Sequence, residues 1–118
     1  NINKSYPGLV NYYIEATKGY ASARNKCIEV SEANTLIFID DDEWVTKNWL
    51  SSLLKTQKDY DAAVVIGPVL SDLPVNTPKW IKQGGFFDRE RHPTGLKMKY
   101  GWSGNALINK KKVTPKEL

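Results

Sequence analysis

The sequence has little of the residue types that build covalent cross-links or soft metal sites. Its 118 residues include one cysteine, one methionine and one histidine. Because Cys27 is alone, the chain can form neither an internal disulfide nor a cysteine-rich zinc site. A reducing compartment fits this cysteine usage. His92 lies in a segment with loop character, where a lone histidine is more often solvated than a ligand, so it receives no catalytic assignment.

Long hydrophobic runs are also missing, and no window is apolar enough to span a bilayer. Hydrophobic residues make up 41% of the chain and charged residues 25%, which are ordinary values for one globular domain. The net charge is +4, with clusters at residues 110–112 and 89–99. Such clusters can meet nucleic acid, anionic lipid or phosphorylated substrates. A lysine-rich soluble surface explains the triple lysine more simply.

The order of predicted elements is strand, helix, strand, helix, strand. We expect strands at residues 10–15, 35–39, 62–69 and 104–108 and helices at residues 21–30 and 46–58, with Thr46 as the N-cap. This alternation is typical of an α/β layered fold with a mostly parallel sheet. In residues 70–102 the periodicity fades, which indicates a functional loop with one helical turn at residues 78–82. A further helix is expected to begin near Lys110 or Lys111.

An acidic cluster follows the second predicted strand. Residues 36–39 are apolar and residues 40–43 are all carboxylates. Because like charges repel, a hard cation such as Mg²⁺ or Mn²⁺ would stabilise the cluster. If the strand stays extended, Asp40 and Asp42 face one ligand and Asp41 turns away. A solvated acidic turn is the alternative.

Arg24 and Asn25 follow Gly19 near the start of a predicted helix. Helix N-termini attract anions, and an arginine fork suits a phosphate or a planar base. An Arg24 that pairs with a surface acid is the alternative.

Four motifs in this order resemble the family-2 glycosyltransferases, in particular the bacterial members that build cell-surface polysaccharide. They are the Gly19…Ala23-Arg24-Asn25 segment, the acidic cluster with Trp49-Leu50 behind it, Gly67-Pro68-Val69, and residues 104–108. The resemblance implies a partial GT-A fold, a Rossmann-like three-layer α/β sandwich. Residues 1–118 would then be a single partial catalytic domain. Residues 1–69 would bind nucleotide and metal, and residues 70–118 would form the donor and acceptor side.

The resemblance also implies roles for individual residues. The acidic cluster matches the family's Asp-x-Asp motif, so Asp42 would bind Mg²⁺ or Mn²⁺ on the diphosphate, and Asp40 would contact the ribose or the metal. The other implied residues are Arg24, Asn25 and Asp41 on the nucleotide side and Trp102, Gly104 and Asn105 on the donor and acceptor side, with Trp102 able to stack on a sugar.

A member of this kind would transfer a sugar from a nucleotide-sugar to a saccharide or lipid-linked acceptor with inversion. The metal would stabilise the departing phosphate, and a general base would take the acceptor's proton. We expect a cytoplasmic enzyme of cell-envelope polysaccharide synthesis, with peripheral contact at the inner face of the membrane left open. Nucleic acid is not an expected partner.

Two parts of the family pattern are absent from this sequence. The family opens with strands that carry a nucleotide-binding Asp, and its base lies in a later Glu-Asp pair, which does not occur here. Glu90, between two arginines, is a poor substitute, so no catalytic base is assigned. We therefore expect an inactive fragment. Because its strands would lack neighbours, it should self-associate or rearrange its N-terminal third.

Two other functions remain open at this stage. A phosphotransferase of the haloacid dehalogenase type also places Asp-x-Asp after a buried strand, but it needs Thr or Val where this chain has Trp44. A basic module that binds nucleic acid or anionic lipid is the second alternative. Its aromatic residues are not interleaved with basic residues on one strand, as stacking platforms require.

Overall fold

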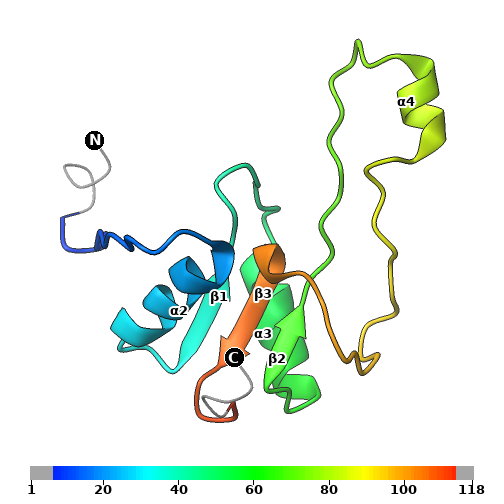
Figure 1. Cartoon of the computed structure of the whole chain (residues 1–118). Helices are drawn as coiled ribbons and strands as arrows, with labels where there is room; N and C mark the ends of the chain where they lie inside the picture. The colour runs from blue at the N-terminus through cyan, green and yellow to red at the C-terminus, as the bar shows by residue number, and fades with distance from the viewer. Residues whose placement is uncertain (1–6, 114–118) are drawn as a thin grey trace. The chain divides into compact units, whose positions relative to one another are not determined.

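The computed structural model describes residues 7–113, which divide into two units, one up to Glu32 and one from Ala33 onward. Each unit is described by itself (Figure 1). The division into parts 1–69 and 70–118 stays a prediction. None of the helices in the described part of the chain is long and apolar enough to cross a membrane.

The first unit contains helix α2 (Tyr20–Val30), which confirms the helix predicted at residues 21–30. It begins after Gly19, whose φ of 129° is a backbone conformation that favours glycine. The Ala23 N–H donates to the Gly19 carbonyl at 3.2 Å and closes the first turn. The helix ends where the extended residue Ser31 donates its N–H to the Cys27 carbonyl.

The strand predicted at residues 10–15 is wrong. These residues have no regular structure and are exposed, with Tyr12 at 82% and Ile14 at 74%. The prediction rested on β-forming residue types, but a strand also needs a partner that takes its hydrogen bonds. In residues 7–113, no strand pairs with this segment.

The second unit is built on a three-stranded sheet of β1 (Thr35–Phe38), β2 (Val64–Ile66) and β3 (Ala106–Asn109), in the order β1-β3-β2. The α/β class is confirmed, but the expectation of mostly parallel pairing is wrong for this sheet. β3 runs antiparallel to both neighbours, with Ile37 opposite Leu107 on one side and Val65 opposite Leu107 on the other. β1 and β2 point the same way, as the intervening helix predicts, and β3 fills the gap between them in the opposite direction (Figure 1).

The core of this unit lies between β3 and helix α3 (Trp49–Asp59). Leu107 is fully buried and packs with Leu53 of α3 and Val65 of β2. Helix α3 begins later than predicted, because Asn48 occupies the N-cap position. Thr46 instead accepts the Trp49 N–H through its carbonyl at 3.1 Å.

A long excursion connects β2 to β3, and we call residues 70–102 the arm. It contains helix α4 (Lys79–Gly84), which confirms the helical turn predicted at residues 78–82 with a small shift. α4 ends at Gly85, which has a left-handed φ of 60°. The arm leads into the short 3₁₀ helix η1 (Ser103–Asn105), directly before β3.

The chain leaves β3 in a turn, where Lys112 donates its N–H to the Asn109 carbonyl at 2.9 Å. The helix expected near Lys110 or Lys111 therefore does not begin by residue 113. Its predicted continuation lies outside the described residues.

Candidate functional site

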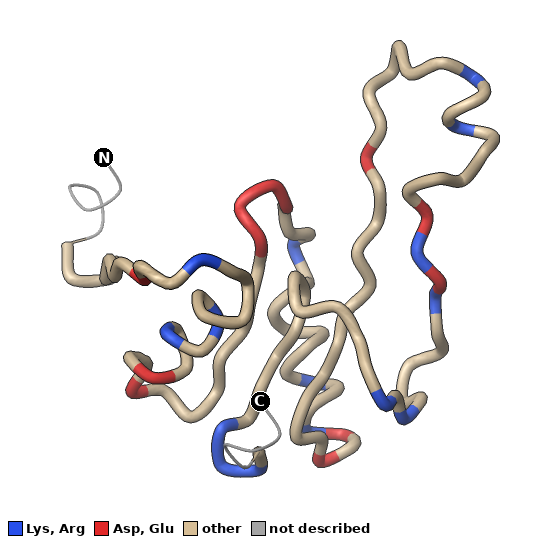
Figure 2. Tube along the Cα trace, viewed as in Figure 1, with Lys and Arg blue, Asp and Glu red and all other residues tan. Residues whose placement is uncertain are grey.

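The acidic cluster forms a tight turn directly after β1, and we call residues 40–43 the acidic turn. The Glu43 N–H donates to the Asp40 carbonyl at 3.2 Å. Asp40 and Glu43 are half-buried, whereas Asp41 and Asp42 are exposed. Figure 2 shows these carboxylates as a continuous acidic loop between β1 and α3. Because the strand ends at Phe38, the extended geometry that would direct Asp40 and Asp42 to one side is not present.

The backbone of Gly104 lies against this turn. A methyl group at Gly104 would be 2.7 Å from Asp40 Oδ2 and 2.8 Å from Glu43 Oε1, too close for any side chain. Gly104 is itself buried in η1. The structure therefore brings together Asp40 and Gly104, two of the residues that the sequence predicts for the site, and adds Glu43.

Asn105 is buried, with 9% of its surface exposed, and both ends of its side-chain amide are bonded. Its Oδ1 accepts the indole N–H of Trp49 in α3 at 2.9 Å. Its Nδ2 donates to the Pro68 carbonyl at 2.9 Å. We call this arrangement the Asn105 bridge. It ties α3, the end of β2 and η1 together, so Asn105 holds the backbone beside the acidic turn.

Gly67 is the close-approach residue of the Asn105 bridge. Its N–H donates to the Asn105 carbonyl at 2.8 Å. A Cβ at Gly67 would lie 2.4 Å from Asn105 Nδ2, so a side chain at this position would push the amide out of place. The Gly67-Pro68 pair thus serves the positioning of Asn105 as well as the end of β2.

Trp102 lies immediately before η1 and is 65% exposed. The Arg89 guanidinium carbon lies 4.8 Å from the centre of a ring of Trp102, within cation–π range. A sugar that stacks on Trp102 would use the opposite face of the indole or displace Arg89.

The donor atoms at the acidic turn fit a hard cation in chemistry, because they are carboxylate oxygens. Within residues 7–113, no three acidic, histidine or cysteine side chains converge as a ready-made cage. Mg²⁺ is commonly held by one or two carboxylates, with water and phosphate oxygens as its other ligands. The turn fits that kind of site, and the choice of Mg²⁺ or Mn²⁺ stays a prediction.

Arg24 and Asn25 lie in the second turn of α2, one half-buried and one exposed. They belong to the first unit, and the acidic turn belongs to the second. A nucleotide site shared by the two groups stays a prediction.

The sequence analysis missed four residues that shape the second unit's site. Glu43 was visible as the last member of the acidic run, three residues after Asp40, which is the spacing of a tight turn. Nothing in the sequence indicates that Trp49 or Gly67 contacts Asn105, or that Arg89 lies over Trp102, because these contacts join distant segments.

Comparisons with known proteins agree with this picture. The model of the family described as Glycosyl transferase family 2 matches residues 1–114. A curated protein of Rhizobium meliloti (strain 1021), "Succinoglycan biosynthesis protein ExoM", is 35% identical over 88 residues. That alignment covers 75% of this chain but 28% of the relative, so this chain matches less than a third of that protein's length. No solved structure matches the chain.

Proposed function

Because the chain belongs to glycosyl transferase family 2, we propose that it forms the metal and sugar-donor side of an enzyme that transfers a sugar from a nucleotide-sugar during polysaccharide synthesis. The family implies the Rossmann-like GT-A fold, and the described α/β elements agree with part of it. Membership favours this function over a phosphotransferase or a basic binding module. The acceptor in this proposal is a saccharide or a lipid-linked saccharide.

One observation supports the proposal most strongly: the acidic turn and Gly104 meet at the end of the sheet. Asp42 is exposed on that turn and can reach a metal on the donor diphosphate, while Asp40 lies between the turn and η1. A bound divalent ion would stabilise the negative charge of the departing nucleotide diphosphate. Asp41 would face the nucleotide, and Trp102 and Gly104 the sugar.

The test is the binding of a nucleoside diphosphate such as UDP to the chain by titration calorimetry. We expect binding with Mg²⁺ or Mn²⁺ that weakens at least about tenfold with EDTA and in Asp42→Asn, since a charge-assisted contact is worth about 1.5–3 kcal/mol. Asp72→Asn, an exposed acid of the arm, is the matched control and should bind like the parent chain. Metal-independent binding, or equal affinity in both variants, would contradict the proposal.

Self-association belongs to this proposal as well. In the sheet of residues 33–113, β1 and β2 are the two edge strands, and unpaired edges invite pairing with another copy. Sedimentation velocity should show a concentration-dependent dimer, and a strict monomer would refute it. Inactivity of the 118-residue chain alone, a cytoplasmic location and contact with the inner face of the membrane stay predictions.

A further inference from the structure

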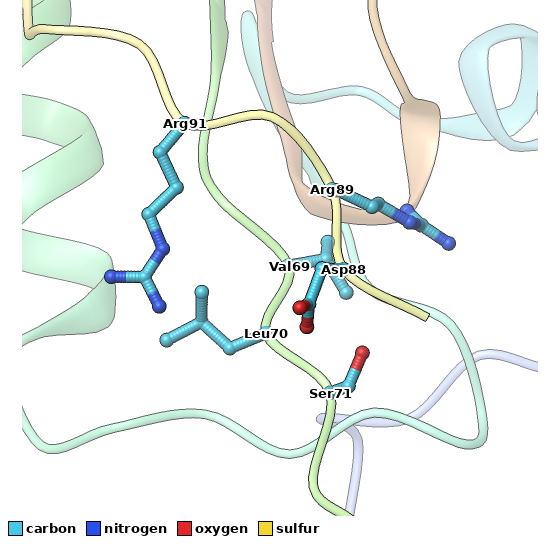
Figure 3. A pocket seen from close by; sticks show the side chains of 6 residues that line it. All are labelled: Val69, Leu70, Ser71, Asp88, Arg89 and Arg91. Atoms are coloured by element: carbon cyan, nitrogen blue, oxygen red, sulfur yellow. The ribbon is translucent and has the colours of Figure 1, made fainter. Parts of the chain in front are cut away.

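A second cavity with charged walls lies between the two legs of the arm. It encloses about 260 Å³ and is lined on the outgoing leg by Val69, Leu70 and Ser71 and on the returning leg by Asp88, Arg89 and Arg91 (Figure 3). We call it the arginine cavity. The proposed donor site does not use it.

The charge of this cavity favours an anion. Two guanidinium groups face one carboxylate, because Glu90 is not part of the lining and lies 3.9 Å from His92 Nδ1 instead. Guanidinium groups offer forked donors that match phosphate oxygens. In Figure 3 the side chains of Arg89 and Arg91 diverge, so a ligand that reaches both must be longer than a single phosphate.

An apolar cavity adjoins the arginine cavity along the chain. It has a volume of about 190 Å³ and is lined by Trp80, Ile81, Phe86 and Phe87. The Ser71 hydroxyl donates to the Phe87 carbonyl at 2.5 Å, which joins the outgoing leg to the junction of the two cavities. A ligand with an anionic group and an adjacent apolar chain fits this succession.

The arginine cavity is also connected to the proposed donor site within the same unit. Arg89 stacks on Trp102, and Trp102 directly precedes the η1 helix that holds Gly104 against the acidic turn. On the other leg, Val69 follows Pro68, whose carbonyl accepts from Asn105. Both legs of the cavity are therefore attached to residues that position the donor site.

We propose that the arginine cavity binds the diphosphate of an amphiphilic acceptor, with Arg89 and Arg91 on the diphosphate and the aromatic cavity around the first part of its apolar chain. This assignment rests on the proposed function, since it identifies the acceptor as lipid-linked. It also gives Asp88 a testable effect: its carboxylate weakens the binding of an anion.

The experiment measures binding to the 118-residue chain in EDTA, so that a metal site at Asp42 does not contribute. The probes are inorganic pyrophosphate and geranyl diphosphate, a soluble short-chain prenyl diphosphate. We expect Arg89→Ala and Arg91→Ala each to weaken both probes by roughly tenfold. Lys97→Ala, an exposed basic residue of the same arm, is the matched control and should bind like the parent.

Two further variants separate the parts of the ligand. Asp88→Asn should strengthen both probes by about threefold, because it removes a like charge from the cavity. Phe86→Ala should weaken geranyl diphosphate and leave pyrophosphate unchanged. Loss of the selectivity for the prenyl chain without loss of pyrophosphate binding is the expected result for this variant.

UDP in EDTA distinguishes the two sources of diphosphate. Weak UDP binding beside firm geranyl diphosphate binding supports an acceptor site, whereas stronger UDP binding would assign the cavity to the donor and overturn the proposal. No binding of either probe, or binding that ignores both arginines, would also overturn it. Because Asp42→Asn should leave these values unchanged, the result is independent of whether the metal site exists.

Discussion

Asn105 illustrates how much of the site depends on single residues. The sequence predicts it as a lining residue of the donor or acceptor side, and its side-chain oxygen and nitrogen are both bonded within the fold. A buried amide with all its polar atoms paired holds its neighbours in one arrangement. The residue therefore positions Gly104, which is adjacent in the chain and lies against the acidic turn.

Removal of this amide should destabilise the chain. Asn105→Ala leaves the Trp49 N–H and the Pro68 carbonyl without their partner, which we expect to lower the free energy of unfolding by about 2–4 kcal/mol. Urea denaturation measures it, with the exposed Asn76→Ala as a control within about 0.5 kcal/mol of the parent. In a double-mutant cycle, Trp49→Phe should show a coupling of about 1 kcal/mol with Asn105→Ala, and simple additivity would contradict the bridge.

Gly104 is the residue where a single methyl group should change the site. Gly104→Ala places Cβ within 3 Å of the carboxylates of Asp40 and Glu43, and one of them must move. We expect metal-dependent UDP affinity to fall at least about fivefold, because a strain of 1–3 kcal/mol is typical of an inserted methyl in a tight contact. Ser103→Ala, one residue earlier, is the control, and an unchanged affinity of Gly104→Ala would show that the turn does not depend on this contact.

At the scale of elements, the sequence predicts which segments are regular but not which strands are neighbours. The apolar runs at residues 35–39 and 62–69 identify β1 and β2, and the helix between them sets their common direction. β3 comes from a short run after the irregular arm, and nothing local indicates that it enters the gap between them. Burial on both faces predicts a central strand, and an antiparallel central strand satisfies it as well as a parallel one.

The central position of β3 makes it the element on which stability depends most. Leu107 is fully buried between both neighbouring strands and α3, so Leu107→Ala should lower the free energy of unfolding by about 3 kcal/mol. Val64→Ala, on an edge strand and 41% exposed, should cost less than about 1 kcal/mol. Equal losses in urea denaturation would mean that the sheet does not have the order β1-β3-β2.

At the scale of the whole molecule, the predicted nucleotide-binding residues fall into both units. Arg24 and Asn25 belong to the first and the acidic turn to the second, and the family match extends over both. The sequence indicates the acidic turn because its charge pattern is local. The Asn105 bridge and the arginine cavity could not be predicted, because they join segments more than 15 residues apart that carry no shared pattern.

The central claim is that a divalent ion and a diphosphate meet at the acidic turn, next to Gly104. The most direct measurement is the broadening of backbone amide signals in ¹⁵N NMR spectra when Mn²⁺ and UDP are added at low molar ratio. We predict that the amides of Asp40, Glu43 and Gly104 broaden first and that Asp42→Asn abolishes the effect. Broadening centred on the other acidic turn, at Asp59 and Asp61, or an effect that persists in Asp42→Asn would contradict it.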